Sequence, residues 1–353
     1  MRVPSPWLAL GAALLLTACG GTAAPAASVP ASAQVKPAAI ASAPAKPAAS
    51  AAASGERLVV SHSQLTSTPN AAAAAAGLFA KHGLNVEVRY IPQGATGQQV
   101  LLSGETQFGE FGGAEMVAAA AGGADLLILA NLEPVYPFKF MVPKDVQKPA
   151  DLKGKRIGIT TVGSVDDTSI RAALPKFGLD PTKDVTLVPV GPEPARVAAL
   201  INGQIQGTDA TPKAVLDLEQ AGMHALFDIA ELGLPAATAA IAAQRPWVNG
   251  HRDATQRYMD AIVEAIALER KDKAFEQGVM KKVFSIDDQR VLDAVYDYYV
   301  LHSMAAVPLP KLEDFKATAE QVAVQNPKVK DLDVPKLLDA SFVQSAVDRG
   351  LNK

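Results

Sequence analysis

Short polar residues and glycines follow several apolar stretches of this chain, where they could hold a small molecule by hydrogen bonds. Hydroxyl, amide and imidazole groups donate and accept hydrogen bonds, and a glycine at a helix start lets a ligand approach backbone N–H groups. In an open α/β sheet, ligands bind beyond the carboxyl ends of the strands. The predicted ligand-binding residues are Ser61, His62, Ser63, Gln64, Gln93, Glu110, Phe111, Gly112, Gly113, Gly163, Ser164, Asp209 and Thr211, with Tyr136 as a ring that could stack on a ligand.

Structural roles compete with ligand binding at several of these positions. The polar residues from Ser61 to Thr68 could instead cap the alanine-rich helix that begins near Ala71. Gly112 and Gly113 could form no more than a tight turn between a strand and a helix. Ser164 could serve as the N-cap of its own helix. Both interpretations stay open on the sequence.

The charged residues favour a neutral or cationic ligand over an anion. Glu110 and Glu115 lie close to the glycine turn, where their carboxylates would oppose an anion. Arg171 and Arg196 fall within expected helices rather than at strand ends, so neither is a candidate for clamping a sulfonate or carboxylate. The formal net charge is −3 and basic residues do not cluster, so we do not expect binding to nucleic acid.

Residue types that would carry covalent, metal or cofactor chemistry are sparse. Cys19 is the only cysteine, and the 5 histidines are not spaced as metal ligands. Asp166 and Asp167 are adjacent on an expected helix and therefore point to different faces, which argues against a catalytic carboxylate pair. We therefore predict no catalytic residue, no metal and no cofactor.

Residues 85–127 resemble residues 184–226 at a constant offset of 99 positions. Two copies are too few for a solenoid, which needs at least three, but they suit two similar α/β lobes with a ligand site between them. We expect the glutamines that follow the glycine turns to bond local backbone rather than ligand. The matched pairs are Val86 with Val185, Leu101 with Leu200, Gly104 with Gly203, Gln107 with Gln206 and Gly123 with Gly222.

Strands and helices alternate in both copies, which predicts two doubly wound α/β lobes with parallel sheets. The extended segments Tyr136–Val142 and Ala236–Ala243 lie outside the repeats, and we interpret them as two crossover segments that join the lobes. After Trp247 the pattern is helical to the last residue. Residues 56–137 and 244–353 are predicted to form lobe 1 with the C-terminal helices, and residues 138–243 to form lobe 2.

The first residues are typical of a secretory signal peptide, here residues 1–18. Arg2 precedes the apolar run Leu8–Leu16, and Leu16-Thr-Ala-Cys19 has the form of a cleavage box. This box resembles that of bacterial lipoproteins, which implies that Cys19 is lipidated, with palmitate among the acyl chains, and anchors the protein to a membrane. Residues 19–55 are rich in Ala, Pro and Ser and lack the residues needed for a core, so they predict a disordered tether.

Several phrases of the chain resemble the periplasmic solute-binding proteins of ABC importers, in the group that handles nitrate, sulfonates, taurine and thiamine precursors. They are Gly77-Leu-Phe-Ala-Lys-His-Gly-Leu-Asn-Val-Glu-Val88, Leu102-Ser-Gly-Glu-Thr-Gln-Phe108, Asp151-Leu-Lys-Gly-Lys-Arg-Ile-Gly158 and Phe177-Gly-Leu-Asp-Pro-Thr-Lys-Asp-Val185. The resemblance implies a two-lobed, type II binding-protein fold. It also implies a monomer that captures a small molecule in the inter-lobe cleft and passes it to an ABC permease and its ATPase.

Because of two departures from that family, the resemblance implies the fold of this chain but not the identity of its ligand. The family usually carries Asp where Gln107 and Gln206 stand, and Thr208-Asp-Ala-Thr-Pro212 lacks the aromatic residue often found there. Two other functions are possible on the same fold: an enzyme resembling a pyrimidine-precursor synthase, and a membrane-tethered sensor without a permease. The cysteine cluster of such a synthase is absent, which favours the binding protein over the enzyme. The predicted signal peptide places this binding protein on the periplasmic or extracellular face of the membrane.

Overall fold

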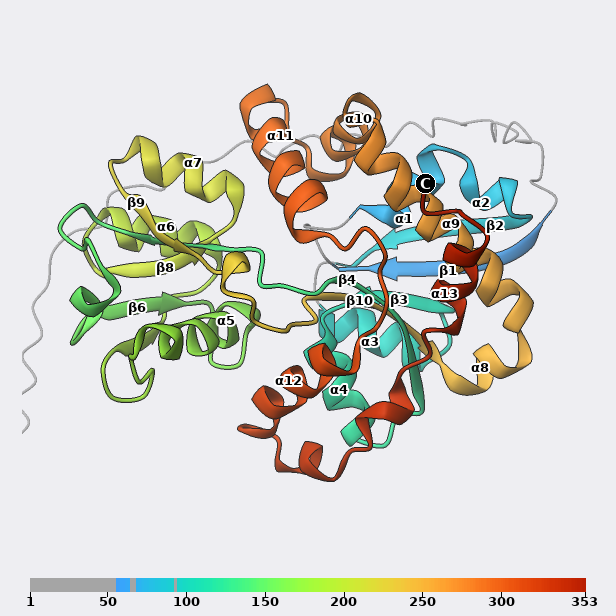
Figure 1. Cartoon of the computed structure of the whole chain (residues 1–353), viewed down its shortest axis with the longest axis horizontal. Helices are drawn as coiled ribbons and strands as arrows, with labels where there is room; N and C mark the ends of the chain where they lie inside the picture. The colour runs from blue at the N-terminus through green and yellow to red at the C-terminus, as the bar shows by residue number, and fades with distance from the viewer. Residues whose placement is uncertain (1–54, 64–67, 92–93) are drawn as a thin grey trace, which may run out of the picture. The chain divides into compact units, whose positions relative to one another are not determined.

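The computed structural model describes residues 55–63, 68–91 and 94–353 (Figure 1). The predicted signal peptide, Cys19 and the tether lie outside the described residues, and so do Gln64 and Gln93. Within the described part, no helix combines the length and apolarity that a membrane span requires.

The first of two sheets has five strands in the order β2-β1-β3-β10-β4. Strands β2, β1 and β3 are parallel, and β10 runs antiparallel between β3 and β4. The strands are β1 (Glu56–His62), β2 (Leu84–Tyr90), β3 (Phe108–Phe111), β4 (Leu126–Glu133) and β10 (Ala239–Gln244), and the accompanying helices are α1 (Pro69–Ala75), α2 (Leu78–Lys81), α3 (Gly94–Leu102) and α4 (Gly113–Ala121).

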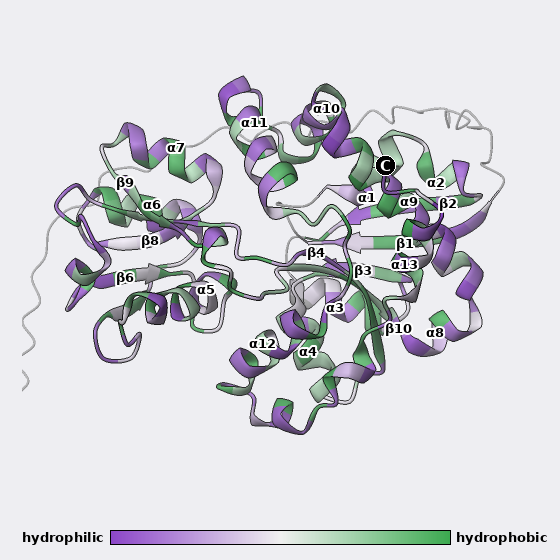
Figure 2. Cartoon of the chain, in the orientation of Figure 1, coloured by the Kyte–Doolittle hydropathy of each residue, from purple (hydrophilic) through white to green (hydrophobic). Residues whose placement is uncertain are grey.

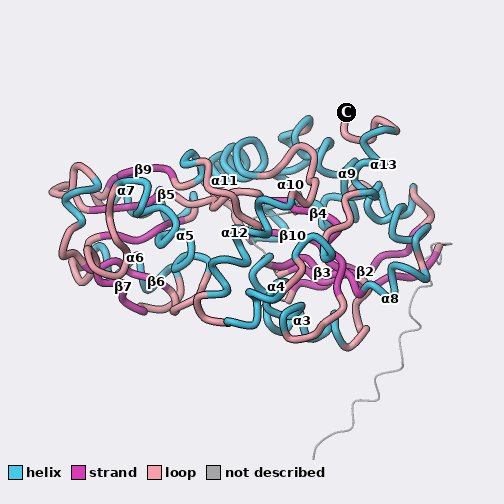
Figure 3. The backbone as a smooth tube through the Cα atoms, turned by 60° about the horizontal axis from the view of Figure 1, so that its bottom comes forward, coloured by secondary structure: helices cyan, strands magenta, loops and turns pink. Residues whose placement is uncertain are grey.

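The second sheet repeats this topology in the order β7-β6-β8-β5-β9, with β5 as its antiparallel member. Figure 3 shows the strands of the two sheets as separate groups. The elements are β5 (Lys139–Val142), β6 (Arg156–Ile159), β7 (Thr186–Pro189), β8 (Gly207–Ala210), β9 (His224–Asp228), α5 (Val165–Ala173), α6 (Glu193–Ile201) and α7 (Pro212–Gln220), with 3₁₀ helices at Pro149–Leu152, Leu174–Phe177 and Ala230–Leu232.

The sequence predicted parallel sheets, but each sheet contains one antiparallel strand, β10 or β5, and the two crossovers explain why. Chain leaving β4 of the first sheet enters the second sheet as β5, and chain leaving β9 of the second returns to the first as β10. Each crossover strand therefore inserts against the direction of its neighbours. The boundary predicted at residue 243 would assign β10 to lobe 2, whereas β10 pairs with β3 and β4 of the first sheet.

The repeat of 99 positions appears directly in the element bounds. Helices α3 and α6, strands β3 and β8, and helices α4 and α7 begin and end 99 residues apart. Strands β2 and β7 occupy equivalent sheet edges beside β1 and β6. The prediction of two similar lobes in separate sheets is therefore confirmed.

The paired glutamines hold the same local structure in each lobe. The amide oxygen of Gln107 accepts from Val59 N at 2.7 Å, and its amide nitrogen donates to Gly104 O at 3.4 Å. Gln206 makes the equivalent bonds to Arg156 N at 3.2 Å and to Gly203 O at 3.0 Å. Each glutamine ties its glycine turn to the neighbouring strand, as expected for residues of the framework.

Apolar residues on both faces of the first sheet bury it between two helical layers. Leu127 and Leu129 of β4 join the cluster under α1, α9 (Arg252–Lys271) and α13 (Ser341–Asp348), whereas Leu126 and Ile128 join the cluster under α4 and α12 (Leu312–Ala323). This double burial explains why β4 and β10 are nearly continuous apolar runs, green over most of their length in Figure 2.

Helices follow β10 to the C-terminus, as the sequence predicted. The 20-residue α9 packs on α1 and α13, and α12 packs on α4. The elements are α8 (Arg245–Gly250), α9 (Arg252–Lys271), α10 (Lys273–Phe284), α11 (Gln289–Val295), a π-helix at Tyr296–Ser303, α12 (Leu312–Ala323), α13 (Ser341–Asp348) and 3₁₀ helices at Pro327–Asp331 and Val334–Leu337.

Candidate functional site

A pocket of about 440 Å³ lies between elements of the two lobes, and we call it the α4–α5 pocket. Its volume falls within the range of small-molecule sites. The first lobe contributes α4 and the C-terminal part of α12, and the second contributes the turn before α5 and the first turns of that helix. The lining residues are Ala114, Glu115, Ala118, Gly163, Ser164, Val165, Thr168, Gln321, Val322, Gln325 and Asn326.

A small cavity of about 20 Å³ shares Ala114, Val165, Thr168 and Gln321 with this pocket. Gly112, Tyr136, Ala237, Thr238 and Thr318 complete its lining. The Tyr136 hydroxyl donates to Gln321 Oε1 at 2.5 Å, which links the first crossover to α12. Four predicted residues, Gly112, Tyr136, Gly163 and Ser164, therefore line the pocket or this cavity.

Glu115 supplies the acidic group of the pocket. Helix α4 begins at Gly113, so Glu115 lies in its first turn and its carboxylate folds back over the glycine turn. A Cβ atom added at Gly112 would lie 2.3 Å from Glu115 Oε2, so only glycine leaves room for this arrangement. Burial raises the pKa of Glu115, and its Oε2 has no hydrogen-bond partner among the described residues.

The opposite wall is a tight turn between β6 and α5. Gly163 has φ +86°, a left-handed conformation that favours glycine. Asp167 accepts from Gly163 N at 2.8 Å, and Asp166 accepts from Thr160 N. Ser164 occupies the N-cap position of α5 and donates to Thr161 O at 2.6 Å, but its side chain makes no capping hydrogen bond to the helix. The two aspartates hold the turn that faces the first lobe.

Helix α12 contributes pocket residues that the sequence analysis missed. Gln321 lies in the last turn of α12, Gln325 lies in the turn that follows the helix, and both line the pocket. A Cβ atom at Gly163 would lie 2.6 Å from Gln325 Oε1, which shows how closely the two lobes approach here. The sequence held no signal for them, because α12 begins 139 residues after the end of α5 and is brought to it only by packing on α4.

The residues predicted at the end of β1 lie apart from the pocket. Ser61 is buried, and its hydroxyl lies 3.5 Å from that of Thr106. The ring of His62 lies 5.2 Å from that of Tyr90, and Ser63 N donates to Glu110 O at 3.0 Å. None of the three lines the pocket, so their contact with a ligand stays a prediction.

Two of the residues predicted at the end of β3 point into the fold. Glu110 shares its strand face with Phe108, and its carboxylate accepts from Asn70 Nδ2 at 2.7 Å on the α1 side of the sheet. Phe111 is fully buried in the cluster under α4 and α12. Strand alternation explains both positions, because successive side chains alternate between the faces of a sheet. Gly113 packs directly against Ala237, where an added Cβ would lie 2.5 Å from the Ala237 Cβ.

Asp209 and Thr211 are engaged inside the second lobe. Ser169 Oγ donates to Asp209 Oδ2 at 2.7 Å, and the backbone N and Oγ1 of Thr211 both bond the Glu193 carboxylate at 2.8 Å. Burial is the main cause that raises the pKa of Asp209, to about 7, although Arg196 opposes the rise. Neither residue lines the α4–α5 pocket.

Arg196 lies on helix α6, as expected, but its side chain reaches the end of β8. This side chain is almost fully buried, and its guanidinium bonds Thr208 at 3.0 Å and Asp209 at 3.2 Å at the end of β8. Its length carries it from α6 to the sheet edge, which a residue-by-residue reading of helix positions cannot show. Because two aspartates neutralise it, Arg196 stabilises the second lobe rather than offering a free cation.

Arg171 is the arginine that faces solvent beside the pocket. It lines an adjoining pocket of about 300 Å³ that shares Thr168, Gln321 and Gln325 with the α4–α5 pocket. Its Nε donates to Asp167 Oδ1 at 2.7 Å. Together the two pockets present the carboxylates of Glu115 and Asp167, the guanidinium of Arg171 and several neutral hydrogen-bonding groups.

A family model described as NMT1/THI5 like matches residues 64–272, which is more than half of the 353 residues. The chain belongs to the NMT1/THI5-like family. The resemblance stated on the sequence phrases is thereby confirmed. The taurine-binding periplasmic protein of Escherichia coli (strain K12) is 33% identical to this NMT1/THI5-like protein over 177 residues. That match covers 48% of this chain and 52% of the relative, so it spans about half the length of that curated protein.

Solved structures confirm the fold of this NMT1/THI5-like protein. The periplasmic aliphatic sulphonate binding protein SsuA from Escherichia coli matches with a TM-score of 0.68 at 23% identity, covering 80% of this chain and 92% of SsuA. The desulfurization enzyme DSZB matches with a TM-score of 0.61 at 16% identity, covering 83% of this chain and 99% of DSZB. The fold therefore occurs in both binding proteins and enzymes.

Proposed function

We propose that this protein is an extracytoplasmic solute-binding protein that captures a small molecule in the α4–α5 pocket and delivers it to an ABC permease and its ATPase. Membership of the NMT1/THI5-like family and 33% identity to a taurine-binding periplasmic protein support this function. The pocket carries the proposal, because its walls come from both lobes. The candidate site includes Gly112, Glu115, Tyr136, Gly163, Ser164, Thr168, Gln321 and Gln325.

Capture follows from the geometry of the two walls. A ligand that touches Glu115 on α4 and Ser164 before α5 at the same time gains both sets of contacts only when the lobes are close. Such a ligand binds the closed state more tightly and shifts the population toward it. Delivery then requires opening, which the permease would promote by favouring the open state.

The ligand class is suggested by Glu115. A carboxylate oxygen without a protein partner in an enclosed site is costly unless a ligand group bonds it. We propose that an ammonium or another strong donor of the ligand faces Glu115, while an acidic group points toward Arg171 and the neutral donors. Taurine has this form, with an ammonium at one end and a sulfonate at the other.

Glu115→Gln is expected to weaken taurine binding by about tenfold to a hundredfold, because it removes a hydrogen bond to a charged group. Calorimetric titration with taurine, ethanesulfonate and ethylamine measures the contribution of each end of the ligand. The wild type should bind taurine most tightly, and ethanesulfonate binding should be spared or strengthened in the variant. Glu313→Gln, at an exposed position of α12, is the matched control and should leave all three affinities unchanged.

Unchanged taurine affinity in Glu115→Gln would show that no ammonium lies at this carboxylate. Gly112→Val tests the location independently, because the added side chain must displace the Glu115 carboxylate from its place. That variant should bind taurine more weakly while unfolding at a similar denaturant concentration. If Gly112→Val binds taurine as tightly as the wild type does, the ligand does not lie in this part of the cleft.

We also propose that Cys19 carries the lipid that holds the protein at the membrane. Cys19→Ala is expected to move the protein from the membrane fraction to the soluble fraction without changing ligand affinity, since the tether predicted for residues 19–55 would separate the anchor from the pocket. Fractionation of cells followed by immunoblotting measures the distribution. A variant that stays in the membrane fraction would contradict lipidation at this residue.

A further inference from the structure

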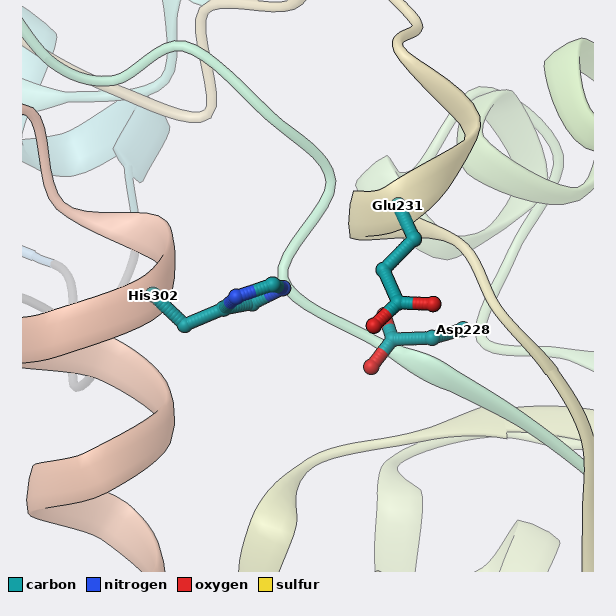
Figure 4. Close-up of side chains that lie close together, drawn as sticks. All are labelled: Asp228, Glu231 and His302. Carbon is teal, nitrogen blue, oxygen red and sulfur yellow. The ribbon is translucent and has the colours of Figure 1, made fainter.

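Three metal-ligating side chains converge away from the α4–α5 pocket. One ligand atom each from Asp228, Glu231 and His302 lies within 4.8 Å of the other two (Figure 4). Asp228 ends β9 and Glu231 lies in the 3₁₀ helix Ala230–Leu232, both in the second lobe. His302 lies in the π-helix Tyr296–Ser303, whose Tyr296, Tyr299 and Val300 pack in the core of the first lobe.

Neighbouring groups fix the orientation of two of these side chains. Asp228 Oδ1 accepts from the Tyr298 hydroxyl at 2.7 Å and from Ala230 N at 3.0 Å, and these two bonds restrain the orientation of the carboxylate. The rings of Tyr298 and His302 lie 5.4 Å apart. A π-helix closes its hydrogen bonds five residues apart, so residues four apart lie near each other on one face, and such segments are frequent at functional sites. Hydrogen-bonded outer residues of this kind orient ligands in metal sites.

We propose that Asp228, Glu231 and His302 bind a divalent transition-metal cation, of which zinc is the best match, and that this ion clamps the second lobe to the C-terminal helices. One imidazole nitrogen and two carboxylates are a zinc donor set, whereas magnesium and calcium prefer oxygen ligands alone. Water would complete the coordination. Lys139 is a nearby cation, with its Nζ 5.8 Å from the centre of the Tyr298 ring. Attraction of the metal ion by the two carboxylates must exceed its repulsion by this ammonium group.

Binding requires the ligand atoms to draw together. Zinc bonds of about 2.0–2.2 Å leave neighbouring ligand atoms roughly 3.5 Å apart in a tetrahedral site. Because the ligands come from both lobes, their convergence would pull the π-helix toward β9 and bias the lobe equilibrium. This second part of the proposal rests on the proposed function: zinc and the solute should then change each other's affinity by the same factor.

Calorimetric titration of the full chain with zinc, in a Cys19→Ser background that removes the only thiol, tests the site. One zinc ion per chain is expected, with affinity reduced at least tenfold in His302→Ala and in Glu231→Gln. Cobalt used as a probe should give the visible absorption of a tetrahedral site in the parent protein and lose it in both variants. His251→Ala is the matched control at another exposed histidine and should bind zinc like the parent.

Equal zinc binding by the parent, His302→Ala and Glu231→Gln would overturn the site, as would an equal loss in His251→Ala. Circular dichroism of each variant separates loss of a ligand from loss of the fold. Taurine titrations with and without zinc test the clamp: identical taurine affinities would overturn the coupling and leave the metal site standing. A parent protein that binds zinc but not taurine would instead contradict the proposed ligand class alone.

Discussion

Arg196→Ala is expected to lower the free energy of unfolding by about 3–5 kcal/mol, the usual cost of removing one partner of a buried ion pair. The guanidinium contacts Asp209 at 3.2 Å and Asp166 at 3.5 Å, and it also bonds Thr160 and Thr208. Asp209 is fully buried, so alanine would leave its carboxylate without its main counter-charge. The loss should appear as a lower midpoint of urea denaturation.

The size of this loss should depend on pH. Burial raises the pKa of Asp209 to about 7 despite Arg196, so the folded protein binds more protons than the unfolded chain between pH 4 and 7. At pH 5 the carboxyl is largely neutral and needs its partner less, whereas at pH 8 it is ionised. Arg196→Ala should therefore be more destabilising at pH 8 than at pH 5.

Arg156→Ala provides the control for Arg196→Ala. Arg156 lies on β6 of the same lobe and is exposed, and its side chain donates to Gln204 O at 3.2 Å. We expect its removal to cost less than about 1 kcal/mol, as for other surface substitutions. If the two arginine variants unfold at the same urea concentration, the buried ion pairs of Arg196 do not stabilise the second lobe.

The wild-type protein is expected to lose stability as the pH rises from about 4.5 to about 7, and Glu276→Gln should flatten that slope. Glu269 and Glu276 are buried together under α1, and Thr68 donates to Glu276 Oε1 at 2.6 Å. Burial is the main cause that raises the pKa of Glu276 to about 7 and that of Glu269 well above its usual value. Glu110 adds to the rise at Glu269 by repulsion.

The sign follows from proton binding. Between pH 4.5 and 7 the folded state retains protons that the unfolded chain has released, so rising pH favours unfolding by up to about 1.4 kcal/mol per pH unit for each such proton. Glutamine keeps an oxygen that Thr68 can bond but carries no titrating proton. Urea denaturation across this pH range measures the slope in both proteins.

Glu320→Gln, at an exposed position on α12, should keep the wild-type slope. A Glu276→Gln variant with the wild-type slope would contradict the assignment of this pH dependence to the buried pair. The buried glutamate pair lies in the first lobe and Asp209 lies in the second. The changes in unfolding free energy caused by Glu276→Gln and by Arg196→Ala should therefore add in a protein that carries both substitutions.

The sequence alone determined the framework of this protein, because local patterns report local structure. The offset of 99 positions reappears in the bounds of α3 and α6, and in the order of strands in both sheets. Gln107 and Gln206 were predicted to bond local backbone because each follows a glycine turn, and both do. The bonds to Gly104 O and Gly203 O lie within one turn, so turn residues are sufficient to place them. The bonds to Val59 N and Arg156 N also require β1 and β6 to lie beside the strand that follows each glutamine.

Tertiary structure decided which side chains line the pocket. Glu110 and Glu115 are five residues apart, yet strand alternation buries Glu110 under α1, and the first turn of α4 carries Glu115 into the pocket. Arg196 reaches a strand end through the length of its side chain. Gln325 with Gly163, and His302 with Asp228, meet only because elements after β10 pack back against both lobes. Contacts over such separations depend on how completed elements pack together, and the local sequence carries no period or motif that records them.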